Sequence, residues 1–401
     1  MPPSTSTITI AFLSWKFLLL AITLLTPAPY DTSTSLILSP PTTLLQSLLE
    51  KLTRWDAIYF VKAAHRGYAN EQEWAFGYGF VRAVRGVYWA LSPALKYMDL
   101  PQPYGYALSA VLLANLAHAL STAVLYALTR EIFPLNRKLP LMASLLHVIS
   151  PAGLFLSAPY SESLFALLSF SGMYCYVRGY VVIAGAWMFL ATMVRSNGLL
   201  SGAVFLLDFW RAGCGLVVGG EGRGWRAVGR LVGLGIGGLL VGAGSAFPQW
   251  LAYGRYCLAG VGAGEPRSWC NSMVPSIYFF VQERYWNVGL FRYWTIPNVP
   301  LFLLATPALL VLICSGTWAI HGGAGPVAGK LAIPQMLLAV MALLTYHVQI
   351  ITRLSSGCVV WYWWVACMIC AGDVRARWIV HWMVCYALIQ GVLFAGFLPP
   401  A

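Results

Sequence analysis

The chain has 401 residues, of which 59% are hydrophobic and 9% charged, against roughly 25% charged residues in an ordinary soluble domain. This composition excludes a soluble single-domain protein and predicts a polytopic helical membrane protein. The 17 Trp, 21 Tyr and 19 Phe agree, because aromatic rings concentrate where a chain passes from hydrocarbon to headgroups. The net charge of +12 favours anionic headgroups or phosphorylated substrates as partners. Nucleic acid is the poorer partner, since no basic run or nucleic-acid motif lies outside the membrane-sized segments.

The apolar runs predict an all-α polytopic fold, a single membrane domain over residues 1–401. A helix needs about 20 apolar residues to cross the hydrocarbon, and the runs with the hairpin described next give about 10–11 membrane helices. The first run lacks a basic region and an evident cleavage site, so we expect a retained helix rather than a signal peptide. The runs centre on residues 8–27, 104–129, 140–157, 161–177, 229–252, 296–319, 328–350, 357–372 and 378–398.

Residues 180–211 form a longer apolar stretch, which the tetrapeptide Arg195-Ser196-Asn197-Gly198 interrupts. The stretch is either one helix with a buried Arg or a hairpin of two short helices with the tetrapeptide at its tip. We prefer the hairpin because, with a cytosolic amino terminus, it collects basic loop residues on the cytosolic side, as the positive-inside rule requires. These residues are Arg130, Arg137, Lys138, Arg178, Arg211, Arg223, Arg226, Arg230, Lys330, Arg375 and Arg377.

Two polar segments are expected on the opposite, lumenal side. Residues 28–100 are too polar to span a membrane and too aromatic for a linker, and Leu residues at helical spacing over 44–52 predict an amphipathic interfacial helix. A second lumenal loop is expected over residues 253–295. It carries Cys257 and Cys270, which would form a disulfide in an oxidising lumen.

The 13 Asp and Glu residues are few enough to consider one by one. Those on the predicted cytosolic side lie near Arg or Lys and are expected to be solvated or structural partners: Glu131, Asp208, Glu221 and Asp373. A catalytic carboxylate is therefore expected among the others: Asp31, Glu50, Asp56, Glu71, Glu73, Asp99, Glu162, Glu265 and Glu283.

Asp56 is the strongest of these candidates. It follows the surface helix and has Trp55 and Tyr59 beside it, which offer a partly desolvated site and rings on which a sugar can stack. The alternative role is an N-cap for a helix over residues 58–64, and spacing alone does not decide between the two. For Glu71 and Glu73 an exposed turn is the favoured interpretation.

Glu162 opens a membrane helix, where a carboxylate also suits the helix dipole. An ionisable group at membrane depth nevertheless predicts a functional site. Arg195 and Asn197 at the hairpin tip either satisfy the broken backbone or bind a phosphate or carboxylate.

Two further clusters combine polar and aromatic residues. The segment 285–294 interleaves aromatic rings with Asn and Arg, which suits a membrane-interface belt and equally a cleft for a sugar or headgroup. His347 and Arg353 together could neutralise a leaving phosphate, or anchor a helix end at the headgroups. The binding candidates here are Tyr285, Trp286, Asn287, His347, Gln349 and Arg353.

Eight short strings over about residues 50–370 resemble, in order and spacing, the motif series of the PIG-V family, GPI mannosyltransferase 2. Each string is weak alone, but eight in order are specific. They are Trp55-Asp56-Ala57-Ile58-Tyr59-Phe60, Gly67-Tyr68, Glu73-Trp74-Ala75-Phe76, Tyr160-Ser161-Glu162-Ser163-Leu164-Phe165, Arg195-Ser196-Asn197-Gly198, Trp269-Cys270, Tyr285-Trp286-Asn287-Val288-Gly289 and His347-Val348-Gln349.

The resemblance implies a multi-pass enzyme of the endoplasmic reticulum with a GT-C-like helical bundle and a lumenal active site, in which residues 28–100 are the catalytic loop. Such an enzyme takes mannose from dolichyl-phosphate mannose and adds the second mannose, α-1,6-linked, to the GPI glycolipid precursor. The expected partners are these two lipids and the lipids of that membrane. A divalent metal and a small membrane accessory subunit stay open.

The expected reaction is a direct displacement with inversion, in which Asp56 is the base that accepts the proton of the acceptor hydroxyl. Arg195, His347 or Arg353 would stabilise the leaving phosphate, and Glu162 and Asn197 would orient sugar hydroxyls. The other expected binding residues are Trp55, Tyr59 and Glu73.

A transporter or flippase of a lipid-linked sugar is the alternative function. Transporters often have broken helices in corresponding positions of two repeats, whereas this chain has one interruption, at Arg195–Gly198, and one large loop. An enzyme is therefore favoured. One departure from the family pattern is Gly77-Tyr78-Gly79, where the family usually continues Phe-Pro after Ala75-Phe76, and it predicts a looser backbone there.

Overall fold

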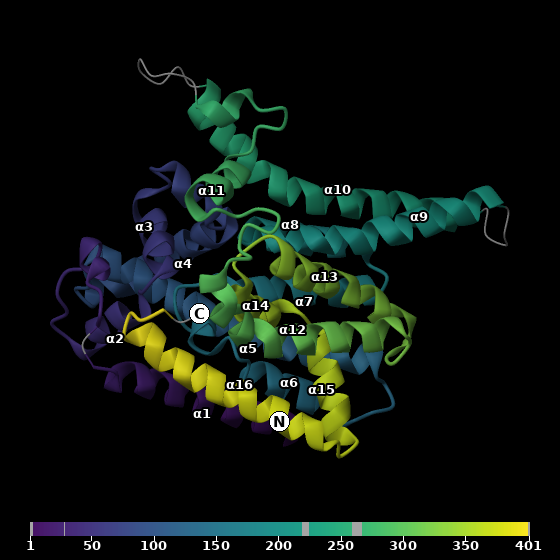
Figure 1. The fold of residues 1–401 in the computed structure, drawn as a ribbon, viewed down its shortest axis with the longest axis horizontal. Helices are drawn as coiled ribbons and strands as arrows, with labels where there is room; N and C mark the ends of the chain where they lie inside the picture. Colours follow the sequence, from purple (N-terminus) through teal and green to yellow (C-terminus); the bar gives the residue numbers. More distant parts are fainter. Residues whose placement is uncertain (1–2, 28, 219–223, 259–266, 400–401) are drawn as a thin grey trace.

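The computed structural model describes residues 3–27, 29–218, 224–258 and 267–399, and within these ranges all regular structure is helical (Figure 1). The prediction of an all-α membrane protein is confirmed. The helices are α1 (Pro3–Leu25), α2 (Leu44–Leu52), α3 (Asp56–Arg66), α4 (Tyr78–Tyr97), α5 (Gln102–Ile132), α6 (Leu139–Val148), α7 (Glu162–Val177), α8 (Val181–Val194), α9 (Gly202–Val218), α10 (Trp225–Tyr253), α11 (Ile277–Trp286), α12 (Val299–Ile320), α13 (Gly325–Leu344), α14 (Ile351–Leu354), α15 (Val360–Cys370) and α16 (Val374–Ala395).

Seven helices of the described ranges are long and apolar enough to cross a membrane, or eight if the bent pair 348–357 and 360–370 is one span. This is fewer than the 10–11 membrane helices expected. The difference arises because α6, α7 and α8 have 10, 16 and 14 residues, short of the length that the hydrocarbon requires. Three of the residues considered above, Glu221, Arg223 and Glu265, lie outside the described ranges.

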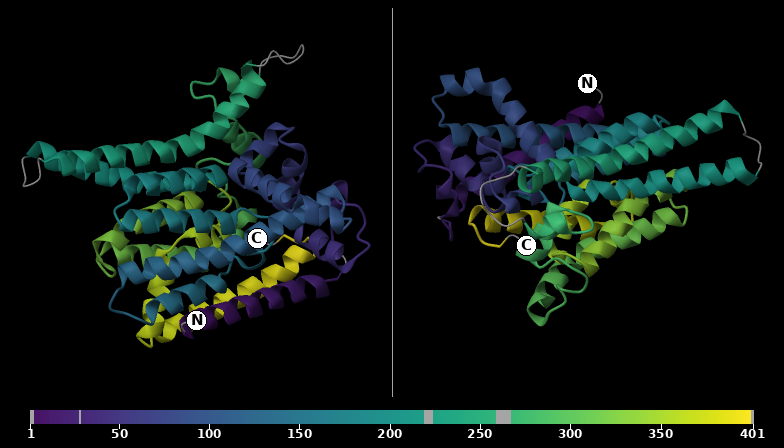
Figure 2. Two further views of the ribbon diagram at one scale, coloured as in Figure 1. Left: turned by 180° about the vertical axis from the view of Figure 1, so that it is seen from behind. Right: turned by 90° about the horizontal axis from the view of Figure 1, so that it is seen from above.

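The predicted hairpin over residues 180–211 is confirmed. The helix breaks at Arg195, whose backbone is extended, and a short 3-10 helix, η4 (Ser196–Ser201), leads into α9. Both arms pack on α10: α8 runs parallel to it and α9 antiparallel, so the arms run in opposite directions. In Figure 2 the α9 and α10 helices extend beyond the rest of the bundle. The contacts that set these directions pair Gly233 with Val181, Gly244 with Thr192, Val241 with Gly202, and Gly235 with Phe209.

The predicted amphipathic helix is also confirmed. Helix α2 begins after Thr43, whose side chain accepts a hydrogen bond from the Gln46 backbone amide, which is an ordinary N-cap. Leu49 and Leu52 are buried against the core. The chain turns from α2 directly into α3, so this packing fixes where α3 begins.

Helix α7 connects the two ends of the bundle. At its last turn Arg178 forms an ion pair with Glu131 at the end of α5, 2.9 Å apart. At its first residue, Glu162, it meets residues from the end of α8 and from α14. Helices α1 and α16 pack side by side along the bundle (Figures 1 and 2). The predicted site residues Asp56, Glu162, Arg195 and Arg353 all gather at the end where α7 begins.

Candidate active site

Asp56 is the first residue of α3, and its carboxylate does not cap the helix. The N-cap position is Trp55, which makes no side-chain cap and has a φ of 55°. A bulky residue at positive φ is strained, and such strain clusters at functional sites. Oδ2 of the Asp56 carboxylate instead accepts hydrogen bonds from Nη1 and Nη2 of Arg353, each at 3.0 Å. Of the two roles predicted for Asp56, the N-cap is therefore excluded.

Arg353 reaches a second carboxylate, that of Glu162. Its Nε lies 3.5 Å from Oε1 of Glu162, and Nη1 of Arg195 lies 2.7 Å from the same oxygen. Arg195 Nη1 also donates to the hydroxyl of Ser161 at 2.9 Å. Two carboxylates and two guanidiniums from α3, α7, α14 and the hairpin tip thus form one charge-balanced network.

The four members of this network differ in exposure. The side chain of Asp56 is 35% exposed, those of Arg353 and Arg195 are 17% and 16% exposed, and that of Glu162 is 1% exposed. Within the described residues, every hydrogen bond to the Asp56 carboxylate goes to Oδ2. Oδ1 of Asp56 is therefore free to accept a proton, whereas Glu162 lies behind the two arginines as their counter-charge.

Tyr160 is a site residue that the sequence suggests only as part of a motif. Its hydroxyl accepts the Asp56 backbone amide at 3.1 Å and donates to the Arg54 carbonyl at 3.3 Å, so it fixes the turn into α3. The rings of Phe155 and Tyr160 also lie 5.1 Å and 5.6 Å from the Arg353 guanidinium carbon, within the range of a cation–π contact.

The prediction of an exposed turn at Glu71 and Glu73 is wrong, most clearly at Glu73. Its side chain is 2% exposed, and it forms an ion pair with Arg66. Its Oε2 accepts the backbone amides of Ala69 and Asn70 at 2.7 and 3.2 Å. The Glu73 carboxylate completes a capping box. The sequence contains the signal for this motif, because Asn70 precedes Glu73 by three residues. Both carboxylate oxygens of Glu73 therefore already have hydrogen-bond or ion-pair partners within the protein.

The residues around His347 form a cluster that is separate from the charge network. His347 Nε2 lies 2.9 Å from the Trp286 carbonyl, and its ring stacks on Tyr293 with 4.7 Å between centroids. The Tyr293 hydroxyl donates to Gln349 at 3.0 Å. These contacts join the segment after α11 to the segment before α14.

Aromatic rings connect the His347 cluster to α3. Tyr59 stacks on Phe76 with centroids 4.6 Å apart, and Trp286 meets the edge of Phe76 at 5.9 Å. The Trp55 ring packs on Phe397 at 5.2 Å. Tyr59 and Trp286 therefore share one aromatic contact, and Trp55 lies apart from it.

The remaining predicted binding residues are not drawn into the charge network. Tyr285 is 44% exposed, and Asn287 takes the left-handed conformation that ends α11. Asn197 is partly exposed in η4. Beside it, Ser196 hydrogen-bonds the Tyr278 hydroxyl at 2.7 Å. Burial raises the pKa of Tyr278, while this hydrogen bond and Arg195 oppose the shift.

Gly77 and Gly79 pack tightly, contrary to the looser backbone expected from the departure at this position. A Cβ at Gly77 would lie 1.8 Å from the Val194 carbonyl oxygen, and one at Gly79 3.0 Å from the Val194 backbone nitrogen. Only glycine allows α4 to approach the last residue of α8 so closely. Val194 immediately precedes Arg195, so this contact sets the position of the hairpin tip.

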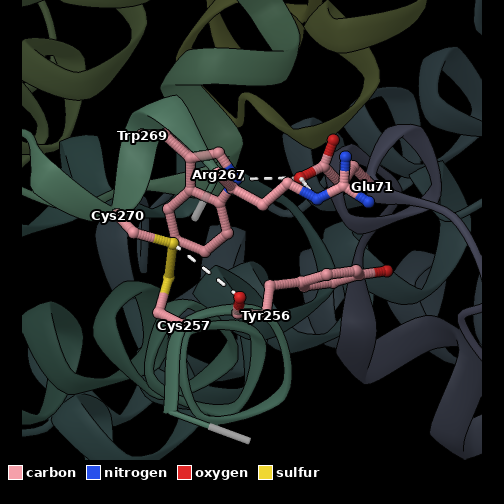
Figure 3. Close-up of a disulfide and its surroundings, with 6 residues drawn as sticks. All are labelled: Glu71, Tyr256, Cys257, Arg267, Trp269 and Cys270. Atoms are coloured by element: carbon pink, nitrogen blue, oxygen red, sulfur yellow. Dashed lines mark hydrogen bonds and ion pairs between the residues drawn. A yellow bond between two sulfur atoms is a disulfide. The ribbon is translucent and has the colours of Figure 1, made fainter. Parts of the chain in front are cut away.

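The segment after α10 is joined to the first loop beside η2 (Glu71–Ala75) (Figure 3). Cys257 and Cys270 form a disulfide with their Cα atoms 5.7 Å apart. Trp269 Nε1 donates to Glu71 at 3.0 Å, and Arg267 lies 3.6 Å from the same oxygen. The two loops expected over residues 28–100 and 253–295 therefore contact each other. Among the described residues no group of three or more metal-ligating side chains occurs.

Comparison with known proteins gives one consistent result. The family described as "Mannosyltransferase (PIG-V)" matches residues 6–321. A Chaetomium globosum protein named GPI mannosyltransferase 2 is 45% identical, covering 98% of this chain and 96% of its own. A Yarrowia lipolytica protein of the same name is 34% identical over 99% of both chains.

Among solved structures, the Archaeoglobus fulgidus oligosaccharyltransferase aligns with 98% of this chain and 55% of its own, at 12% identity and a TM-score of 0.49. This likeness is too distant to carry an argument about the site.

The fold and the site define a polytopic helical membrane protein with an open carboxylate and an arginine-rich network at one end of its bundle. The chain belongs to the PIG-V mannosyltransferase family and is a glycosyltransferase.

Proposed function

We propose that this protein transfers mannose from dolichyl-phosphate mannose to a GPI glycolipid precursor in the lumen of the endoplasmic reticulum, adding the second mannose in α-1,6 linkage. The names of its relatives support a GPI acceptor. The observation that carries the mechanism is the Asp56 carboxylate, anchored through Oδ2 and free at Oδ1.

In the proposed reaction the acceptor hydroxyl attacks the anomeric carbon of mannose and gives its proton to Oδ1 of Asp56. The new carbon–oxygen bond forms as the bond to the phosphate oxygen breaks, and dolichyl phosphate leaves with the electron pair. Attack opposite a β-linked phosphate gives an α-linked product. A positioned base of this kind typically contributes about 10²–10⁴-fold to the rate.

The charge network suits this proton transfer. Before reaction, the Asp56 and Glu162 carboxylates balance the Arg195 and Arg353 guanidiniums. Asp56 loses its negative charge when it takes the proton, and the leaving phosphate gains one, so the total charge of the occupied site does not change. Arg353 is then released from a charged partner at the moment that negative charge grows on the phosphate.

Arg195 is the proposed phosphate ligand of the site. In the part of the chain that the structure describes, its hydrogen bond to Ser161 and its ion pair with Glu162 both use Nη1. Nε and Nη2 are left for an anion, and a guanidinium can hold phosphate in a two-pronged geometry. His347, by contrast, is engaged with the Trp286 carbonyl.

The experiment is to give the detergent-purified protein labelled dolichyl-phosphate mannose and a one-mannose GPI precursor. We expect a two-mannose product that a linkage-specific α-1,6-mannosidase cleaves. A product of another linkage would reject the proposed regiochemistry, and transfer to no GPI acceptor would reject the proposed substrate. A transporter would show no turnover once vesicles are dissolved, so the same assay separates the alternative.

A further inference from the structure

Lys16 is a buried amine in the middle of α1. The helix belongs to the membrane-length set, and the Lys16 residue is 6% exposed. From Lys16 to the end of the helix at Leu25 the distance is about 14 Å at 1.5 Å per residue. Ionisable side chains so far into a membrane segment are costly and mark functional parts of a protein. The proposed mechanism has not used this residue.

The amine of Lys16 holds the segment between α6 and α7. Its Nζ donates to the Leu156 carbonyl at 2.9 Å and to the Ser157 hydroxyl at 2.7 Å. This segment, residues 149–161, contains only a short 3-10 helix, η3 (Gly153–Leu156). Non-helical backbone within a membrane domain persists only where the protein satisfies its polar groups. Lys16 satisfies the backbone carbonyl of Leu156 and also binds the side-chain hydroxyl of Ser157.

Two neighbouring side chains serve the same segment. Asn115 of α5 donates to the Ser157 carbonyl at 3.2 Å, and Ser163 of α7 donates to the Leu156 carbonyl at 3.0 Å. The turn at Leu156 and Ser157 is therefore held from α1, α5 and α7. Lys16 is the member that comes from the first helix, far away in sequence.

The same segment carries the groups that hold the charge network. Phe155 lies under the Arg353 guanidinium, and Tyr160 holds the Asp56 amide. Ser161 accepts the hydrogen bond of Arg195. Phe155 is adjacent to Leu156, so a shift of the turn that Lys16 holds would move the ring against which Arg353 rests.

We infer that Lys16 is a positioning residue for the transfer reaction. It fixes residues 155–161 so that Arg353 and Asp56 keep the geometry that leaves Oδ1 open, and it acts through these residues without touching substrate. The inference rests on the proposed active site, and wild-type turnover in the assay above tests that proposal separately.

The test compares Lys16→Met with Thr23→Val in purified protein. Thr23 is a matched control because it is also buried in α1, and its hydroxyl donates to the Leu19 carbonyl of its own helix, with no other partner among the described residues. For Lys16→Met we expect kcat per folded molecule to fall about tenfold to a hundredfold, since small misplacements of reacting groups have effects of this size. The KM for the donor should stay within about twofold, and Thr23→Val should match wild type. Equal kcat in both variants and wild type would overturn the inference.

A double-mutant cycle with Ser157→Ala separates positioning from general stability. If Lys16 acts through the turn, the two substitutions are not additive in kcat, because each removes the same contact. Additive effects would mean that Lys16 acts elsewhere. If Lys16→Met fails to accumulate, Ser157→Ala alone takes its place, since it removes one of the two hydrogen bonds and keeps the other. Unchanged kcat in a folded Ser157→Ala protein would then reject the inference.

Discussion

Asp56 and Asp208 meet basic residues at opposite ends of α7, and the two clusters differ in what they leave open. At the second cluster Lys330 Nζ lies 2.7 Å from Oδ1 and 2.9 Å from Oδ2 of Asp208. Tyr176 also donates to Oδ2, and the Asp208 side chain is 5% exposed. About 21 Å separates Tyr176 from Glu162 along the helix at 1.5 Å per residue.

This difference is the reason for proposing Asp56, and not Asp208, as the catalytic base. Asp208 has cations or donors at both oxygens and almost no exposure, so its charge holds α7, α9 and α13 together. Asp56 is bound through one oxygen and is 35% exposed. A carboxylate whose oxygens are all engaged is a structural partner, whereas one anchored at a single oxygen is fixed in place and still able to take a proton.

The largest effect is expected for Asp56→Asn. An amide can still accept a hydrogen bond from Arg353 but cannot act as the base, so kcat should fall about 10²–10⁴-fold while the unfolding temperature stays near wild type. Activity and thermal unfolding are measured on one detergent preparation. Asp208→Asn is the matched control: it should unfold at a lower temperature and keep its kcat per folded molecule. Equal kcat losses in the two variants would erase the distinction between the clusters.

Lys330→Met tests the Asp208 cluster by removing its lysine. Removing one partner of a buried ion pair leaves an uncompensated charge and costs about 3–5 kcal/mol of stability. Arg230, whose Nη2 lies 3.8 Å from Asp208, should moderate the loss. Denaturant unfolding measures the cost, and turnover per folded molecule should not change. A folded but inactive variant would show that this cluster reaches the active site.

Gly77→Ala tests the packing that places the hairpin tip. The added methyl group meets the Val194 carbonyl, and overpacking of this kind costs about 1–3 kcal/mol. Because Arg195 follows Val194, turnover should fall together with stability. At Gly86, inside α4, an added Cβ would meet no atom of a neighbouring element within 4 Å, so Gly86→Ala should be neutral or slightly stabilising. If both variants behave alike, the close approach of α4 and α8 does not matter for the site.

Arg195→Lys should have the smallest effect, about a tenfold loss of turnover, which corresponds to about 1.4 kcal/mol. An ammonium can keep the ion pair with Glu162 but cannot reproduce the two-pronged fit to phosphate. Arg178→Lys is the control at the other end, where the side chain is 44% exposed and such pairs contribute little. Full activity of Arg195→Lys would assign Arg195 to charge balance alone.

The sequence predicts the individual parts of the site better than their pairing. Asp56, Glu162, Arg195 and Arg353 are recognisable because charged residues are rare here and each interrupts an apolar or aromatic context. That Arg353 binds Asp56 is not predictable, because 297 residues separate them and only the tertiary fold brings the start of α3 next to α14.

The fold, too, is predictable where it depends on local composition and not where it depends on tertiary contacts. Hydropathy and loop charge predict the all-helical class and the hairpin at Arg195, since both depend on local composition. They overestimate the number of full spans, because short apolar helices such as α6 give the same signal as membrane-length ones. Lys16 is visible in the sequence as a lone charge in the first apolar run, but its partners at Leu156 and Ser157 depend on tertiary contact.

The most direct test of the central claim, that Oδ1 of Asp56 takes the acceptor proton, is chemical rescue. Asp56→Ala removes the carboxylate from a site that is 35% exposed, so added formate can enter and serve as the base. We predict that folded Asp56→Ala protein is nearly inactive, that formate restores mannose transfer in a concentration-dependent manner, and that Asp208→Ala does not respond to formate. Near wild-type transfer by Asp56→Ala without formate would contradict the account.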